Sequence, residues 1–513
     1  MLRQTERTMA SNIGSQLVVS LLISLTLAVV SSFIIAQFQS RLKFPIVNVK
    51  KGEWTWRNAR KRFQTNAAEV LQEGQRLTDG PFHVVTDTRG VMTYLPPHYA
   101  EYIKNDNRFS FAEFAHRDMM GYLPGFEAFG SILKSGIAID AVQKKISPNM
   151  EKLTAPISNT MAEAVRKNWG EDSKFHEIEL KKTVLFMVAQ VTARLFVGPE
   201  LSNNPDWLRL SVTYTVDTFL ASKELGRYSW PLTWIAQWFN VRAGRVRASM
   251  REACQIIGPI IAKRARDEAA DNEKGGRADA ISWYRQVAKG REYDEAIAQV
   301  GLALAAIHTT GDLLFRTLLR LADHPQLMTE LRKEAAQAIT THGLNKTGVY
   351  HMQLLDSAIK ESQRLDTVAP AIMNRYVKED ATLPNGVTIP KGYLTTIITD
   401  IMQSEKTYKD AKKWDPYRFY NLRQNGYEQK GQLVSATAEH LAFGFGKHAC
   451  PGRFLAAHEL KIILAHLVLK YDIEFKKGAT RAGASANVPA GDTRVVQVRR
   501  RKEEIEIPTL PEV

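Results

Sequence analysis

One of only two cysteines, Cys450, stands in a glycine-rich turn directly before an apolar helical pattern. The ten residues read Phe443-Gly-Phe-Gly-Lys-His-Ala-Cys-Pro-Gly452, and Pro451 suits a first helical position. A cysteine at a helix start faces unpaired backbone N–H groups, which favour the thiolate over the thiol. The glycines lack β-carbons, so a large flat ligand has room beside the main chain and Phe443 could pack on it. We therefore expect Cys450 to bind iron as a thiolate, which favours cleavage of an O–O bond; the alternative is a buried free cysteine without chemistry.

The elements that would position this turn are mostly helical. Long amphipathic patterns dominate the chain, and one of them runs from about Asp294 to Leu321, before Asp323-His-Pro325. Strands are expected at two places, where Asp87-Thr-Arg-Gly90 and Pro384-Asn-Gly386 are hairpin signals. We therefore expect a helix-rich body with small sheets, forming one domain.

Composition narrows the function classes. The 513 residues are 44% hydrophobic, which is ample for a large core, and two cysteines cannot form a disulfide framework. Cys254 sits on an ordinary helical face and is assigned no role. The net charge of +15 is spread along the chain without a base-stacking motif, so no nucleic-acid partner is expected. An anionic membrane surface and an acidic redox partner fit the charge better, and a basic surface without a partner is the alternative.

The N-terminus predicts a membrane anchor. No charged residue occurs between Arg7 and Arg41, and residues 17–36 are twenty mostly apolar positions, enough to cross a hydrocarbon core of roughly 30 Å. Basic residues follow this run in greater number than they precede it, which places the body in the cytoplasm. A cleaved signal peptide is the alternative. The predicted division is a lumenal segment (1–16), an anchor (17–36), a linker and membrane-proximal segment (37–69) and a catalytic domain (70–513).

The pattern Phe-x-x-Gly-x-(Arg/His)-x-Cys-x-Gly resembles the haem-binding signature of the cytochrome P450 family, and the wider resemblance spans roughly residues 80–500. It implies a mainly α cytochrome P450 fold, here with an N-terminal transmembrane helix, and haem b held by the axial thiolate of Cys450. By the same resemblance, the residues expected to bind the cofactor also include Phe443, Gly446, His448 and Gly452. His448 stands where the family usually has arginine and is the best candidate partner of a haem propionate. Lys144 or Lys145 is a weaker candidate, and a surface lysine pair is the likelier interpretation of these two.

Two further segments gain a role through the resemblance. Glu361 and Arg364 lie at i and i+3 on one helix face, and Arg418 follows in Trp414-Asp-Pro-Tyr-Arg-Phe419. In the family such residues form a buried network that supports the haem region and has no direct chemistry.

Ala305-Ala-Ile-His-Thr-Thr310, in the middle of the long helix, resembles the family's oxygen-activation motif. Thr309 matches the motif's hydroxyl, whereas His308 stands where an acid is usual and Ala306 replaces glycine. Splitting dioxygen consumes protons, so His308 could relay them at neutral pH; equally, it could only pack or form a hydrogen bond within its helix.

The substrate is the least determined property. By position in the resemblance, Met119–Phe126 would form a roof over the haem, with Val368–Met373 and Ala303–His308 as walls. These segments are mainly apolar, which suits a hydrophobic ligand, although plain core packing is an equal alternative. The motif forms resemble a subset from filamentous fungi that often oxidises terpenoids, including diterpenes and meroterpenoids, in specialised metabolism.

The predicted function is a monooxygenase of the endoplasmic-reticulum membrane, single-pass with a cytoplasmic catalytic domain. It would use dioxygen and electrons from NADPH–cytochrome P450 reductase to hydroxylate or further oxidise its substrate. A haem-thiolate isomerase or dehydratase is the first alternative, and would need neither NADPH nor dioxygen. A non-catalytic membrane haem-binding protein is the second, and would bind haem without substrate-stimulated NADPH consumption.

Overall fold

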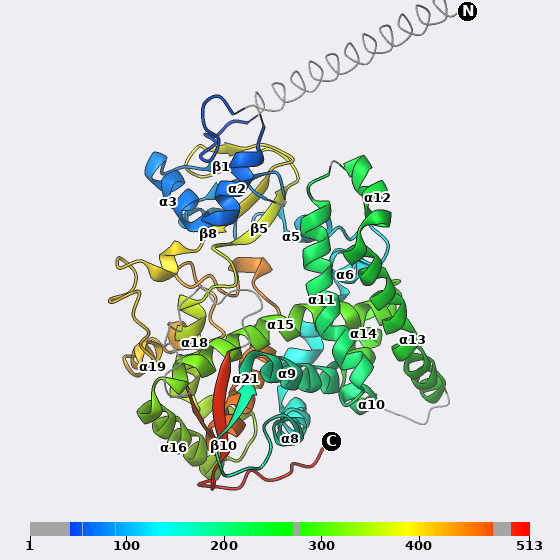
Figure 1. Ribbon diagram of the computed structural model, residues 1–513, viewed down its shortest axis with the longest axis vertical. Coiled ribbons are helices and arrows are strands. Elements are labelled where there is room, and N and C mark those ends of the chain that lie inside the picture. Colours follow the sequence, from blue (N-terminus) through cyan, green and yellow to red (C-terminus); the bar gives the residue numbers. More distant parts are fainter. Residues whose placement is uncertain are drawn as a thin grey trace, which may run out of the picture.

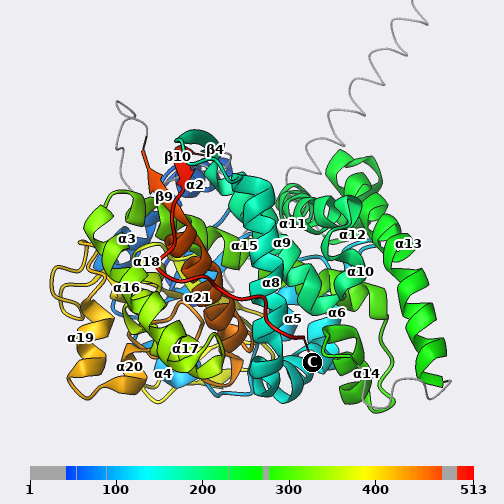
Figure 2. The ribbon, with the colours of Figure 1, turned by 90° about the horizontal axis from the view of Figure 1, so that it is seen from below.

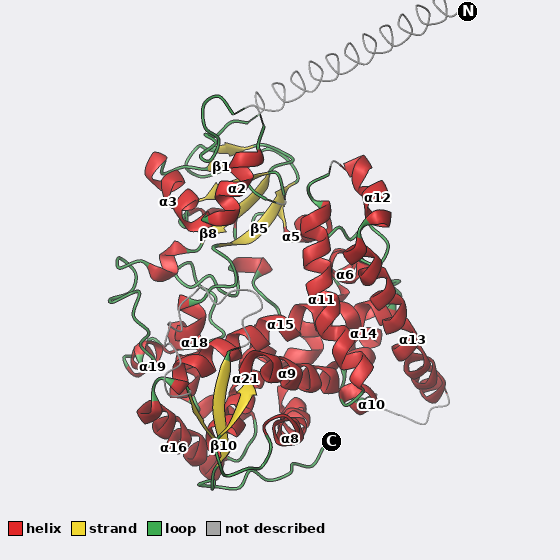
Figure 3. Cartoon of the chain, viewed as in Figure 1, coloured by secondary structure: helices red, strands yellow, loops and turns green. Residues whose placement is uncertain are grey.

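The computed structural model describes residues 42–53, 55–87, 89–228, 230–269, 277–475 and 494–512 (Figure 1). Within these ranges the chain is mainly helical with small sheets, which confirms the helix-rich body predicted from the sequence (Figure 3). The predicted anchor at 17–36 and the segment 1–16 lie outside the described residues. The division at residue 70 stays a prediction.

The five-stranded sheet joins segments from both ends of the sequence. Its order is β1-β2-β8-β5-β3, with β2 and β8 parallel and the other pairs antiparallel. The strands are β1 (Phe82–Val85), β2 (Val91–Leu95), β3 (Phe109–Ser110), β5 (Ala371–Val377) and β8 (Leu394–Ile398). The pairing of β1 with β2 confirms the hairpin predicted around Asp87–Gly90. α2 (Arg57–Thr65) and α3 (Ala67–Leu77) lie beside this sheet (Figure 1).

Two smaller sheets complete the described strands. β4 (His176–Glu179), β10 (Val495–Arg500) and β9 (Tyr471–Glu474) form one, in that order. β6 (Ala381–Thr382) and β7 (Thr388–Ile389) form the other and confirm the hairpin predicted at Pro384–Gly386.

The remaining helices make up most of the body. They are α4 (Tyr99–Ile103), α5 (Phe111–Asp118), α6 (Glu127–Ser135), α7 (Ile137–Ala141), α8 (Met150–Trp169), α9 (Leu180–Phe196), α10 (Pro199–Ser202), α11 (Pro205–Leu225), α12 (Trp230–Phe239), α13 (Val241–Ala269), α14 (Ala280–Ala288), α15 (Glu295–Ala322), α16 (Pro325–His342), α17 (Lys346–His351), α18 (Gln353–Leu365), α19 (Arg418–Gln424), α20 (Glu428–Gly431) and α21 (Arg453–Lys470). A π-helical turn, η1 (Val142–Ile146), and the 3₁₀ turns η2 (Ser147–Asn149), η3 (Asp400–Gln403) and η4 (Gly446–His448) connect them.

α15 is the central helix and matches the helix predicted from Asp294 to Leu321. The Asp294 carboxylate caps it by accepting the Ile297 N–H at 2.9 Å. It contacts α9, α11, α13 and α18, so most of its surface is buried. Among the described helices only α15 is long and apolar enough to span a membrane, and it lies largely in the core.

α21, which follows Cys450, is fixed against α8 by polar contacts inside the core (Figure 2). The His458 imidazole shares a hydrogen bond with the Thr154 hydroxyl at 2.8 Å, and His466 does so with Ser158 at 2.9 Å. Burial lowers the pKa of both histidines to about 3, so both rings are neutral near pH 7. These neutral pairs hold the register of α21 without a buried charge.

α18 carries Glu361 and Arg364, and its start is capped by another helix. Its own N-cap residue, Met352, has no side-chain acceptor. The Glu334 carboxylate of α16 takes that place by accepting the N–H groups of Leu354 at 2.6 Å and Leu355 at 2.9 Å. Free N–H groups at a helix start need such acceptors, so Glu334 anchors α18 to α16.

Replacing Glu334 with alanine is expected to lower the free energy of unfolding by about 1–2 kcal/mol, as for loss of a helix cap. Glu334→Gln should cost less, because the amide oxygen still accepts one N–H group. Lys333→Ala, on the exposed side of the same helix, is the control. Urea unfolding followed by circular dichroism measures the three variants, and equal losses for Glu334→Ala and Lys333→Ala would rule out the cap.

Candidate active site

The loop before Cys450 folds back on itself, so that the cysteine closes a tight turn. The Cys450 N–H donates to the Phe443 carbonyl oxygen at 2.7 Å. Gly444 and Gly446 have φ angles of 71° and 73°, which favour glycine. Phe443 is half-buried and packs against the main hydrophobic core. The loop therefore presents the Cys450 side chain from a defined main-chain geometry.

The surroundings of the Cys450 sulfur correct the predicted start of the helix and add an effect of burial. α21 begins at Arg453, two residues after the predicted start, because Pro451 and Gly452 form a turn ahead of it. The main-chain N–H groups of Gly452 and Arg453 lower the pKa of the Cys450 thiol, as expected for a helix start. Burial nevertheless outweighs them and raises that pKa above its ordinary value. The expected effect of the N–H groups is therefore present, but it is smaller than the opposing effect of burial.

Gly446 is required by the protein's own main chain. A β-carbon at this position would lie 2.4 Å from the Lys104 carbonyl oxygen. The next residue confirms the close packing, because the Lys447 N–H lies 3.2 Å from that oxygen and 2.9 Å from Asn105 Oδ1. At Gly452, by contrast, a β-carbon would make only an ordinary contact, 3.9 Å from Cys450 Sγ. The loop is thus seated on the segment after α4.

The middle of α15 has an open face. Ala305 and Thr309, one turn apart, are exposed, although Leu304, Ile307 and Thr310 around them are buried. The Thr309 hydroxyl donates to the Ala305 carbonyl oxygen at 2.8 Å. An exposed strip in a core helix indicates a space beside it, onto which the Thr309 hydroxyl opens.

His308 points in another direction. Its Nε2 donates to the Val212 carbonyl oxygen of α11 at 2.9 Å, and the ring is half-buried. Burial lowers the pKa of His308, with a smaller lowering by Lys181 and an opposing effect of Asp312. Successive residues of a helix lie about 100° apart, so His308 and Thr309 face different neighbours. His308 therefore joins α15 to α11, which neither of its two sequence interpretations anticipated.

Arg375 is a site residue that the sequence interpretation missed. It lies in β5 after a register irregularity at Ile372–Arg375 and is only 2% exposed. Its Nη1 donates to the Asn374 carbonyl oxygen, whereas Nε and Nη2 have no hydrogen-bond partner among the described residues. Burial lowers its pKa to about 10. A buried, incompletely paired guanidinium is costly, so it indicates a place for an anion.

A signal for Arg375 exists in the sequence. Alternate residues of β5 are buried, and Ala371, Met373 and Val377 on that face are apolar. Arg375 interrupts this buried face with a cation. A charged residue at a buried position of an alternating strand would have identified Arg375 as a candidate from the sequence.

His448 lies close to Arg375. It belongs to η4 and is half-buried, and its pKa is lowered to about 4, chiefly by burial and then by Arg375 and Lys447. Lys144, the weaker sequence candidate, is largely exposed and pairs with Asp140 at 2.6 Å. The structure therefore brings Arg375 and His448 together and gives Lys144 a surface contact.

Glu361, Arg364 and Arg418 meet in the core. Arg364 donates to both Glu361 carboxylate oxygens, at 2.7 and 2.8 Å, and both side chains are 0% exposed. Arg418 approaches the same oxygens at 3.2 Å. Arg364 also donates to the Met402 carbonyl oxygen at 2.6 Å. Two guanidiniums around one carboxylate compensate the burial of these charges and connect α18 to the first residue of α19.

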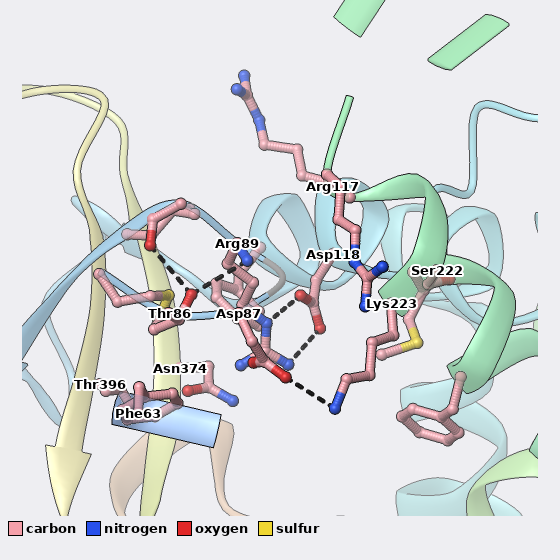
Figure 4. Close-up of a pocket in the computed structure, with 18 of the residues that line it drawn as sticks. Phe63, Thr86, Asp87, Arg89, Arg117, Asp118, Ser222, Lys223, Asn374 and Thr396 are labelled. Atoms are coloured by element: carbon pink, nitrogen blue, oxygen red, sulfur yellow. Dashed lines mark hydrogen bonds and ion pairs between the residues drawn. The ribbon is translucent and has the colours of Figure 1, made fainter. Parts of the chain in front are cut away.

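A cavity of about 1020 Å³ lies between the five-stranded sheet, α2, α5 and α11 (Figure 4). It brings together two segments predicted to enclose the substrate. Met119, Met120 and Tyr122 come from the predicted roof, and Ala369–Ala371 from one predicted wall. The third segment, 303–308, is not among the lining residues of this cavity.

Comparison with known proteins gives a consistent result. The sequence model described as Cytochrome P450 matches residues 136–483. The chain is 39% identical to Cytochrome P450 monooxygenase esdpI of Penicillium shearii, over 91% of this chain and 93% of that protein. It is 37% identical to Cytochrome P450 monooxygenase calE of Penicillium decumbens, over 98% of both chains. Cytochrome P450 monooxygenase pyr3 of Aspergillus fumigatus is 36% identical, over 88% of each.

Proposed function

Because this chain belongs to the cytochrome P450 family and is a haem-thiolate monooxygenase, we propose that Cys450 provides the axial thiolate to haem b. Four observations fit the residues to this cofactor. Cys450 is half-buried at the end of a tight turn. Gly446 seats the Cys450 loop on the main chain at Lys104, Thr309 faces an open strip of α15, and the Arg375 guanidinium lacks a full set of partners among the described residues. When bound, the haem supplies the iron at which dioxygen is split, with one oxygen atom transferred to substrate and one released as water.

Arg375 and His448 are proposed to hold the haem propionates. The Nε and Nη2 donors of Arg375 match the fork geometry with which guanidiniums bind carboxylates. His448 adds a ring donor beside it, and a propionate would offset the positive charge of Arg375. Phe443 and Gly446 are proposed to shape the loop that would hold the cofactor, whereas Glu361, Arg364 and Arg418 would support the surrounding segments without direct chemistry.

Thr309 is proposed to manage protons. Its hydroxyl proton is directed at the Ala305 carbonyl oxygen, so the Oγ1 lone pairs remain available on the open side of the helix. A water held there could exchange a proton with Oγ1 during turnover. His308 is proposed to help mainly by positioning, since its Nε2 bond to Val212 fixes α15 against α11 beside the Asp312 and Lys181 charges.

The substrate is proposed to be a terpenoid or meroterpenoid of a fungal specialised pathway, which the enzyme hydroxylates or further oxidises. The support is the resemblance in the motifs, together with a cavity whose lining includes Met119, Met120 and Phe114. Such apolar side chains accept a hydrocarbon skeleton. The electrons are proposed to come from NADPH–cytochrome P450 reductase, whose docking the +15 charge would favour.

The enzyme is proposed to act on the endoplasmic-reticulum membrane, with residues 17–36 as a single anchor and the catalytic domain in the cytoplasm. An exposed apolar patch on α12 supports a membrane contact. It consists of Leu232, Ile235, Trp238 and Phe239, of which Phe239 is 83% exposed. Patches of this kind on a soluble surface are unusual and suit burial among lipids.

The thiolate assignment is tested by the spectrum of the reduced protein under carbon monoxide. The unchanged protein is expected to show the thiolate form, and Cys450→Ser should lose it. Cys254→Ser removes the only other cysteine and should leave the spectrum intact.

The substrate is tested by coexpressing the protein with the reductase and supplying a panel of terpenoids and meroterpenoids. The products are identified by mass spectrometry. Conversion without NADPH and dioxygen would contradict the oxygenase function.

Replacing Thr309 with alanine is expected to divert electrons from product to hydrogen peroxide. The product formed per NADPH should fall by roughly tenfold or more, because a positioned proton donor is lost, while Thr309→Ser should retain most of the coupling. Product, peroxide and NADPH consumption are measured in the same reaction. Unchanged coupling in the alanine variant would exclude the proton role.

Arg375→Met is expected to act in opposite directions on the two forms of the protein. The haem-free protein should become more stable, by about 1–3 kcal/mol, because a buried and incompletely paired charge is removed. Haem retention should weaken, because a propionate partner is lost. Thermal unfolding of the haem-free protein and the rate of haem transfer to apomyoglobin measure the two effects. Weaker retention with lower haem-free stability would instead indicate a purely structural role.

A further inference from the structure

The cavity between the sheet and α11 carries an excess of positive charge. The described residues that line it include five cations, Arg60, Arg89, Arg117, Lys223 and Arg227, and two carboxylates, Asp87 and Asp118. An apolar substrate alone gives no reason for such a surplus, since charged groups are costly beside a hydrocarbon. The fate of each charge therefore decides what the cavity binds.

Both carboxylates are already engaged by cations of the same cavity. Lys223, near the end of α11, reaches Asp87 in the β1–β2 turn at 2.7 Å. Arg89 of the same turn holds Asp118 at the end of α5, with Nη2 and Oδ2 2.7 Å apart. Thr86 braces the turn, because its hydroxyl accepts the Arg89 N–H and donates to the Gly90 carbonyl oxygen. Figure 4 shows the two ion pairs converging on this turn.

The other three cations are left without a strong acidic partner. No described carboxylate pairs with Arg60, and its buried Nε has no hydrogen-bond partner. Arg117 has a 54% exposed side chain, with its guanidinium carbon 4.0 Å from the Tyr376 ring centre and its Nε 4.0 Å from a Glu113 carboxylate oxygen of the same helix. Arg227 is exposed, and no described carboxylate pairs with it. The cavity thus has hydrogen-bond donors that could bind an anion, and both of its described carboxylates are already paired.

Apolar side chains supply much of the remaining lining. Phe63, Met92 and Phe114 stand between the charged groups, with Met119 and Met120 beside them. A neutral hydrocarbon would leave the buried Arg60 Nε without a partner among the described residues, whereas a small inorganic anion would leave the apolar surface uncovered. A ligand with a hydrocarbon skeleton and one anionic group satisfies both.

We infer that this cavity admits an apolar substrate bearing a carboxylate, with Arg60 and Arg117 as the residues that select for the anion. The inference rests on the proposed monooxygenase function and narrows its substrate class. Both residues are specificity determinants of this cavity, and neither takes part in the reaction. The same cations could also bind the phosphate of a lipid headgroup, so the experiment separates the two anions.

The test compares acids with their methyl esters on the full-length, haem-loaded protein in neutral detergent. Abietic acid with methyl abietate, and dodecanoic acid with methyl dodecanoate, are measured by equilibrium dialysis. In at least one pair the acid should bind roughly tenfold more tightly, and this preference should shrink when salt rises from about 50 to about 500 mM. Equal binding within both pairs overturns the inference.

Variants that change the charge of the cavity should change the preference for the acid in predictable directions. Arg60→Gln and Arg117→Gln should each reduce the acid preference several-fold while leaving ester binding unchanged. Asp87→Asn should increase the preference, because it releases Lys223. Arg209→Gln, on the same helix as Lys223 but paired with Glu252 outside this cavity, is the control and should leave the preference unchanged.

Two further measurements identify the cause of a negative result. The variants are assayed for binding to phosphatidylserine–phosphatidylcholine vesicles. If Arg60→Gln and Arg117→Gln weaken vesicle binding but not the acid preference, the cations serve the membrane and the inference fails. The carbon monoxide spectrum is recorded for each variant. If Arg60→Gln and Arg117→Gln leave the preference for the acid unchanged while the thiolate spectrum is intact, this inference alone is refuted. If the unchanged protein lacks the thiolate spectrum, the proposed function is refuted.

Discussion

The placement of one sulfur atom, at the junction between a tight loop and the helix α21, is the constraint that organises this protein. The loop closes through the bond from the Cys450 N–H to the Phe443 carbonyl oxygen, and it is seated on the main chain at Lys104, where only glycine fits. α21 is in turn held against α8 by hydrogen bonds of two neutral histidines. A shift in either contact would move the sulfur, so distant parts of the chain share in holding it.

Buried charges of the scaffold and of the candidate site differ in how completely they are paired. Around Glu361 the charges are compensated, with two arginines on one carboxylate and further carbonyl acceptors, and such a group is complete without a ligand. Arg375 is similarly buried, but two of its donor atoms have no partner among the described residues. This contrast supports the proposal that Arg375 binds an anion. In the cavity between the sheet and α11, both acids are paired, whereas the Arg60 Nε has no hydrogen-bond partner among the described residues.

Much of this arrangement follows from local sequence. The hairpin at Asp87–Gly90, the long helix α15 and the Glu361–Arg364 pair each depend on residues close together in the chain. Periodicity and turn chemistry encode such features, which is why they were predicted with nearly correct bounds. For the Cys450 thiol, the same local reasoning gave the effect of the amide donors on the pKa correctly but not the larger, opposing effect of burial, because burial is contributed by the whole fold.

The sequence by itself determined the chemistry, since one cysteine in a glycine-rich turn before a helix, and a threonine pair within a long apolar helix, are sufficient to name the family's signature. Only the tertiary structure decided which groups surround that chemistry. It turned His308 toward Val212 of α11, left Arg375 buried with unused donors, and gathered five cations and two acids around one cavity. The physical reason is range: a helical or strand period spans a few residues, whereas a charge's partner can be contributed from anywhere in the chain.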